Sequence, residues 1–186
     1  MRLTLVRHPA PAIAPGLCYG SSDVAVTPHS CDGALAALAG ALPRDASAIY
    51  SSPLQRCGAL AIPLAAQLGL PPPRRDARLA EMDFGAWELR RWDDIPLTEI
   101  DAWAADLVHY APGGGETVLH VARRVAAFLE ALRRQRTASA IVVCHAGTMR
   151  LLAALRDHES VEAAALQAAA TPHRIDYGGV LTLQFQ

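Results

Sequence analysis

The chain has 186 residues, of which 52% are hydrophobic and 19% are charged, a composition typical of a folded globular domain rather than of a disordered chain. Its 17 basic and 18 acidic residues give a formal net charge of −1, so no overall field attracts nucleic acid or an anionic membrane, and we expect neither as a partner. A chain of this length can bury a large core as one unit, and we expect one domain over residues 1–186.

The N-terminal residues offer no signal peptide, because the uncharged run between Arg2 and Arg7 is too short for an apolar core. No apolar run approaches the length of a membrane span. The four cysteines form no CxxC pair, so neither a zinc site nor a disulfide framework is expected. These features predict a reduced, cytoplasmic protein.

Residues 3–6 form an apolar run that predicts a short buried strand. Prolines and glycines crowd the next segment, 9–31, which is therefore expected to be a long connection. Such connections in folded domains are often functional. Residues 33–42 then predict a helix rich in alanine and leucine, and 48–50 a second strand.

Pro53 suits the first turn of a helix that runs towards Leu68. Pro63 lies inside this pattern and is expected to kink or break the helix. The following segment, 84–115, has a weak pattern and holds all three tryptophans, which we expect to pack in the core rather than to stack on a ligand.

Residues 116–135 carry a helical stripe of apolar side chains. The remaining chain predicts a strand at 140–143, helices at 148–155 and 159–168, and closing strands at 173–177 and 180–185. This alternation of strands and helices predicts a three-layer α/β/α sandwich around a largely parallel sheet.

Three of these apolar strands end in residues that can bind phosphate: Arg7 and His8, then Ser51 and Ser52 followed by Arg56, and finally Cys144 and His145. Ligands of open α/β sheets bind just beyond the carboxyl ends of the parallel strands, so these side chains are expected to meet. An arginine fork can hold two phosphate oxygens, and a neutral imidazole is a competent nucleophile near pH 7.

Glu81 is a candidate general acid for the leaving group, since a bound phosphate dianion favours its protonated form. Taken singly, each of these features is more often structural: a solvated strand end, a helix start at Ser51-Ser52-Pro53, or a surface glutamate. Their joint appearance at three strand ends favours a phosphoryl-transfer site.

Five motifs in the same order resemble the histidine phosphatase superfamily, also called phosphoglycerate mutase-like. They are Arg7-His8, Ser51 to Arg56, Leu79 to Glu81 with Phe84 to Glu88, Pro112 to Thr117, and Val143 to Gly147. The resemblance implies a phosphoglycerate mutase-like fold and hydrolysis of a small phosphorylated metabolite through a phosphohistidine, without a metal or other cofactor. It also implies the roles of the residues: His8 as nucleophile, Arg7, Arg56 and His145 as phosphate ligands, and Glu81 as proton donor.

Pro9 departs from this family, in which a glycine follows the nucleophile, and it removes a backbone donor from the loop. The segment from Gly16 to Gly20, followed by Asp23, resembles the loop of α-ribazole phosphatases, which act on α-ribazole 5′-phosphate in cobalamin synthesis. Alternatives are that this segment is only turn chemistry in a phosphatase of broad specificity, or that the chain binds a phosphorylated ligand without turnover. The sequence does not indicate an oligomeric state.

The segment from Cys144 to Arg150 also matches Cys-x5-Arg, the phosphate loop of cysteine-dependent phosphatases. That interpretation leaves His8, Arg56 and Glu81 without a role. We therefore expect Cys144 to be a buried structural residue.

Overall fold

A mixed sheet with the strand order β3-β2-β4-β1-β5 forms the centre of the protein. The computed structural model describes residues 1–172 and 174–186. Strands β1, β4, β2 and β3 pair in parallel, and β5 pairs with β1 in the antiparallel direction. The strands are β1 (Arg2–Arg7), β2 (Ile49–Ser51), β3 (Arg74–Arg75), β4 (Ser139–Cys144) and β5 (Val180–Gln184).

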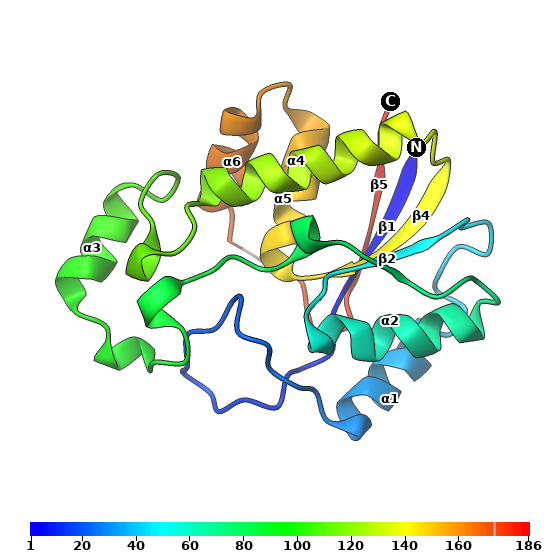
Figure 1. Cartoon of the computed structure of the whole chain (residues 1–186), viewed down its shortest axis with the longest axis horizontal. Coiled ribbons are helices and arrows are strands. Elements are labelled where there is room, and N and C mark those ends of the chain that lie inside the picture. Colours follow the sequence, from blue (N-terminus) through cyan, green and yellow to red (C-terminus); the bar gives the residue numbers. More distant parts are fainter. Residues whose placement is uncertain (173) are drawn as a thin grey trace.

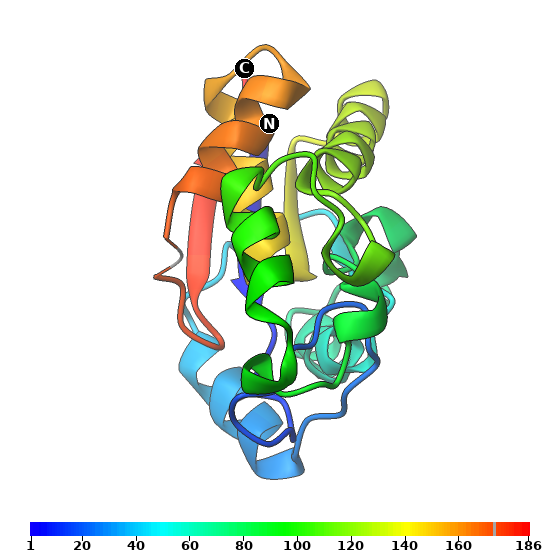
Figure 2. The ribbon, with the colours of Figure 1, turned by 90° about the vertical axis from the view of Figure 1, so that its left-hand side faces the viewer.

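Helices cover both faces of the sheet, which confirms the predicted α/β/α sandwich. Helices α1 and α2 lie on one face and α4, α5 and α6 on the other (Figures 1 and 2). Helix α3 stands on the side of the molecule away from the two chain ends (Figure 1). The helices are α1 (Pro28–Leu38), α2 (Gln55–Gln67), α3 (Leu97–Ala105), α4 (Val118–Arg134), α5 (Ala146–Asp157) and α6 (Val161–Ala170).

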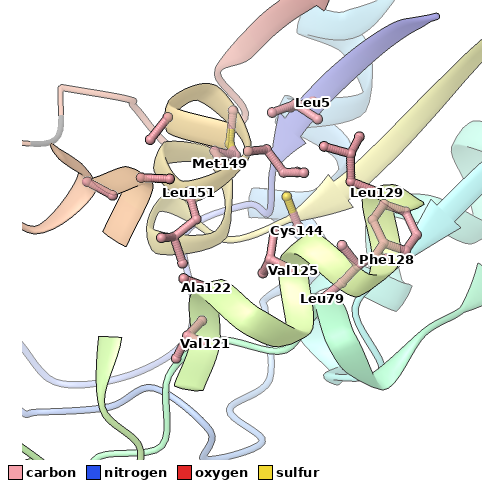
Figure 3. Packing of buried hydrophobic residues seen from close by; sticks show 14 of the residues in the cluster. Leu5, Leu79, Val121, Ala122, Val125, Phe128, Leu129, Cys144, Met149 and Leu151 are labelled. Carbon is pink, nitrogen blue, oxygen red and sulfur yellow. The ribbon is translucent and has the colours of Figure 1, made fainter. Parts of the chain in front are cut away.

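The alternation of side chains along each strand divides the core into two clusters. On β4, Cys144 faces α4 and α5 and is fully buried, whereas Val143 faces the α1 and α2 side. Figure 3 shows the first cluster, in which Leu5, Cys144 and Met149 meet the apolar stripe of α4. The stripe predicted for residues 116–135 therefore packs on the sheet, and the helix begins at Val118 after the N-cap Thr117.

Helix α2 runs unbroken through Pro63, so the predicted break is wrong. A proline in a helix deprives the carbonyl four residues earlier of its hydrogen bond. Here that carbonyl belongs to Ala59, and the thiol of Cys31 on α1 donates to it at 3.1 Å. The neighbouring helix therefore supplies a donor that Pro63 cannot.

The strand predicted at 173–177 is wrong for residues 174–177, which form no strand, while His173 lies outside the described residues. This segment crosses the carboxyl end of β1, where Arg7 donates to the carbonyl of Ile175. Helix α1 begins earlier than predicted, at Pro28, because Thr27 caps it by accepting from the backbone of Ser30. Helix α3 and the short β3 were not predicted.

Candidate active site

The carboxyl ends of β1, β4 and β2 lie side by side at one edge of the sheet. Parallel pairing sets Arg7 opposite Cys144 and Ser51 opposite Val143. The ladder continues past the strands, because the backbone N–H of His8 donates to the carbonyl of Cys144 at 3.0 Å. The residues that follow each strand are thereby brought to one place.

His8 is 3% exposed, and its orientation is set by its neighbour in the chain. Its Nδ1 lies 2.7 Å from the carbonyl oxygen of Pro9. A carbonyl can only accept, so Nδ1 carries the proton and Nε2 keeps its lone pair. The His8 ring lies 5.0 Å from the ring of His145 and 5.5 Å from that of Tyr177, between centroids. Although Pro9 lacks a backbone N–H, its carbonyl oxygen still accepts the hydrogen bond that selects this tautomer of His8.

Burial lowers the pKa of His8 to about 3, and the positive charges of Arg56 and Arg7 add to this effect, while the hydrogen bond to Pro9 opposes it. Burial and the charge of Arg56 also hold the pKa of His145 well below its ordinary value. Both imidazoles are therefore neutral at physiological pH.

His145 follows β4 and is fully buried. Its Nε2 lies 2.8 Å from the hydroxyl oxygen of Ser52, the residue that follows β2. The Cys57 thiol lies 3.5 Å from the same nitrogen. His145 is thus held between two strand ends beside His8.

Arg7 packs against a tyrosine rather than pairing with an acid. Its Nη1 donates to the carbonyl of Ile175 at 2.5 Å, and its guanidinium carbon lies 3.8 Å from the centroid of the Tyr177 ring. Its Nε is buried and has no hydrogen-bond partner among the described residues. Arg7 therefore keeps an unused donor next to His8.

Arg56 is fully buried near the start of α2. Its two terminal nitrogens donate to the carbonyls of Ser22 at 2.7 Å and Gly20 at 2.5 Å, and its Nε is buried without a partner among the described residues. A guanidinium carries five N–H bonds, so three of these remain for another acceptor. A cation without an acidic partner among the described residues, and with unused buried donors, is suited to bind an anion.

Glu88 builds the loop whose carbonyls hold Arg56. Burial alone would raise the pKa of Glu88, but hydrogen bonds from Ser22, Phe84 and neighbouring residues lower it. The ionised carboxylate accepts from the backbone N–H groups of Gly20, Ser21, Ser22 and Phe84 and from the hydroxyls of Ser21 and Ser22. Glu88 thus holds the loop whose carbonyls bind Arg56. It belongs to the motif from Phe84 to Glu88, but no role was predicted for it.

Glu81 reaches the same pocket from the segment that follows β3. Its Oε2 accepts from the backbone N–H of Gly147 at 3.2 Å, in the first turn of α5, and its Oε1 accepts from Met82 at 3.1 Å. A Cβ at Gly147 would lie 2.5 Å from Oε1 of Glu81. A side chain at position 147 would therefore force the Glu81 carboxylate to move from this position.

A pocket of about 380 Å³ opens at this edge of the sheet. His8, Arg7 and Glu81 lie in its wall, whereas Arg56 and His145 are fully buried and do not line it. The rest of the wall is mostly apolar and includes Leu17, Phe84, Trp92, Trp103, Leu107, Val118 and Val121. The catalytic candidates thus share a pocket with room for an organic group.

Two tyrosines and one arginine of this wall were not predicted as site residues. The hydroxyl groups of Tyr19 and Tyr177 lie 2.8 Å apart and join the first loop to the segment before β5. Arg150 lines the wall from α5, where its Nη2 donates to the carbonyl of Ala168. Helical spacing places Gly147, Arg150 and Leu151 on one face of α5, which is a signal that the sequence offered.

The expectation that the tryptophans pack in the core holds for Trp87, which is fully buried. It is wrong for Trp92, which is exposed, and holds in part for Trp103, which packs against the cluster of Trp87. Trp92 and Trp103 both line the pocket, with parallel rings whose centroids are 6.2 Å apart. The cysteine-dependent alternative does not fit either, because burial raises the pKa of Cys144 well above its ordinary value. Cys144 is fully buried in the core cluster with α4 and α5 and does not line the pocket.

Among residues 1–172 and 174–186, no group of three or more His, Cys, Asp or Glu side chains is arranged to hold a metal ion. In the same part of the chain, no helix is both long and apolar enough to cross a membrane.

A family model, described as the histidine phosphatase superfamily (branch 1), matches residues 3–176. The chain belongs to the histidine phosphatase superfamily. The predicted family is therefore confirmed, and with it the phosphatase class of enzyme. A search among curated proteins found no match.

Solved structures of this superfamily share the fold. The α-ribazole phosphatase from Shigella flexneri is 26% identical with a TM-score of 0.81, and the match covers 100% of this chain and 91% of that one. A mycobacterial glucosyl-3-phosphoglycerate phosphatase is 24% identical with a TM-score of 0.81, over 98% of this chain and 89% of that one. The structure of that phosphatase with VO3 is 25% identical, again with a TM-score of 0.81, over 98% and 92% of the two chains.

The lowered pKa of His8 predicts how stability depends on pH. In the unfolded chain, His8 binds a proton below its ordinary pKa of 6.5, whereas in the folded protein it binds one only below about pH 3. The free energy of unfolding therefore decreases as the pH falls from about 6.5 to about 3. Each such group contributes a slope of about 1.4 kcal/mol per pH unit. We expect His8→Asn to reduce the slope of the unfolding free energy between pH 4 and 6 by about this amount, measured by urea denaturation.

His145 adds a slope of the same sign and should keep doing so in the variant. A suitable control is Cys144→Ala, which disturbs the core without removing an imidazole. If the slope of His8→Asn equals that of the wild type, then His8 is not buried in its neutral form.

Proposed function

We propose that this phosphatase hydrolyses small phosphomonoesters through a covalent phosphohistidine on Nε2 of His8. The observation that carries the proposal is the hydrogen bond from Nδ1 to the Pro9 carbonyl, which leaves Nε2 with its lone pair in a pocket shared with Glu81. In the first step, the lone pair attacks phosphorus and the bond to the leaving oxygen breaks. Glu81 gives that oxygen a proton.

In the second step, water attacks the phosphohistidine, Glu81 takes a proton from this water, and the P–N bond breaks. Neutral His8 and inorganic phosphate result, so neither step needs a redox partner or a metal. Arg7, Arg56 and His145 are proposed to bind the phosphoryl oxygens. The unused donors of the two arginines support this role, as does the binding of VO3 and of inorganic phosphate by the mycobacterial phosphatase.

We propose α-ribazole 5′-phosphate as the substrate, which would place the enzyme in cobalamin synthesis. The aromatic part of the pocket wall supports this choice, because Phe84, Trp92 and Trp103 suit a heteroaromatic base better than a sugar acid. Tyr19 of the ribazole-like loop also lies in the wall. A cytoplasmic location and a single domain over residues 1–186 stay predictions.

The nucleophile is tested by trapping phosphate on the enzyme. With a ³²P-labelled substrate, acid-labile label should appear on wild type and on Cys144→Ala but not on His8→Ala, and only His8→Ala should lose turnover. The assays are run in excess EDTA, where we expect full activity. Label on Cys144, or activity that needs Mg²⁺ or Zn²⁺, would contradict the proposal.

The role of Arg56 is tested by a substitution that keeps its charge. Lysine lacks the planar fork that could hold phosphoryl oxygens as charge shifts during transfer, so we expect Arg56→Lys to lower kcat/KM by at least about tenfold. The exposed Arg123→Lys serves as the control. Thermal unfolding separates a loss at the site from a loss of the fold, and an unchanged kcat/KM would remove Arg56 from the site.

The substrate is tested by comparing kcat/KM for α-ribazole 5′-phosphate, glucosyl-3-phosphoglycerate and 3-phosphoglycerate. We expect the first to exceed the others by at least about tenfold, and Trp103→Ala to remove most of that preference. Similar values for all three would favour a phosphatase of broad specificity. Binding of all three without turnover would show a non-catalytic phospho-ligand protein.

A further inference from the structure

The main chain around Glu81 has little regular structure to hold it. Residues 77–79 form one 3-10 turn, and residues 80–84 belong to no helix or strand. The carboxylate nevertheless lies against Gly147 of α5, where a Cβ would come within 2.5 Å of its Oε1 atom. Something outside this segment must therefore fix it.

Arg124 on α4 supplies that support. Its Nη1 donates to the carbonyls of Ala80 at 2.6 Å and Arg78 at 2.9 Å, and its Nη2 donates to the carbonyl of Glu81 itself at 3.2 Å. One side chain thus binds three carbonyls in a stretch of four residues. The backbone of Glu81 is thereby attached to a helix that packs on the sheet.

Glu116 completes the attachment from the residues just before α4. Its Oε1 and Oε2 each accept from Arg124 at 2.8 Å, and Oε2 also accepts from the backbone N–H of Asp83 at 3.1 Å. The backbone N–H of Glu116 donates to the carbonyl of Asp83 at 2.8 Å. The chain is therefore held on both sides of Glu81.

The five N–H bonds of the Arg124 guanidinium match these five hydrogen bonds, so it has none left for a phosphate. Burial would raise the pKa of Glu116, but the hydrogen bond and the charge of Arg124 lower it, so the pair is ionised. Lysine has three donors on one nitrogen and cannot reproduce this geometry.

We propose that Arg124 and Glu116 are positioning residues that set the Glu81 carboxylate for proton transfer to the leaving oxygen. This inference rests on the proposed role of Glu81 as general acid. A displaced acid delivers its proton poorly, and the loss should appear only where the leaving group needs that proton.

The test compares two aryl phosphates. The 4-nitrophenolate of 4-nitrophenyl phosphate leaves without a proton, whereas the more basic phenolate of phenyl phosphate needs one. We expect Arg124→Lys and Glu116→Gln to lower kcat/KM at least about tenfold on phenyl phosphate and less than about threefold on 4-nitrophenyl phosphate. Since kcat/KM reports only the steps through phosphorylation of the enzyme, the later attack of water does not affect it.

Three further variants make the result decisive. Glu81→Gln should show the same leaving-group dependence, and Arg124→Lys combined with Glu81→Gln should lose no more than Glu81→Gln alone. Arg123→Lys, on the next residue of α4 and exposed, should behave as the wild type on both substrates. If Arg124→Lys does not fold, Glu116→Gln still tests the positioning role.

An equal loss on both substrates, no loss on either, or a further loss in the double variant would overturn the positioning role. If Glu81→Gln alone shows no leaving-group dependence, the proposed acid fails and the inference fails with it. If Glu81→Gln shows the dependence and Arg124→Lys does not, only the positioning role fails.

Discussion

The site depends on the parallel pairing of β4 with β1 on one side and with β2 on the other. The three strands end at the same level of the sheet. Backbone pairing alone therefore brings the residues that follow them together. His8 is placed by its own backbone hydrogen bond to β4, and His145 by its contact with Ser52 at the end of β2. Parallel strands present their carboxyl ends together, and this topology is the reason that such distant residues meet.

Burial of positive charge here is unfavourable, because no carboxylate among the described residues forms an ion pair with Arg7 or Arg56. Arg7 and Arg56 lie near His8. The guanidinium of Arg56 donates hydrogen bonds to backbone carbonyls rather than to a carboxylate. Carbonyl dipoles orient the guanidinium but leave its charge uncancelled, which is the property that the proposed phosphate ligand requires. The acids nearby serve other parts: Glu88 holds the loop that receives Arg56, and Glu116 pairs with Arg124.

Strand alternation also separates chemistry from packing at the end of β4. Cys144 and His145 are neighbours in the chain, yet the cysteine faces α4 and α5 in the core while the histidine lies beside His8. A thiol in that core stays protonated, since burial opposes its charge. The Cys-x5-Arg pattern is therefore a coincidence of spacing, and Arg150 serves the pocket wall from the helix that follows.

Local patterns in the sequence determined the apolar strands, the amphipathic stripe of α4 and the order of motifs that identifies the superfamily. They gave wrong predictions where a contact with a residue distant in the sequence determines the local structure. Helix α2 survives Pro63 because Cys31 of another helix bonds the freed carbonyl, and residues 174–177 form no strand although their composition allows one. Likewise, nothing local to Trp92 and Trp103 tells a core position from a pocket wall. Only the tertiary structure decided those matters, together with the partners of Glu81, because each depends on contacts between residues far apart in the chain.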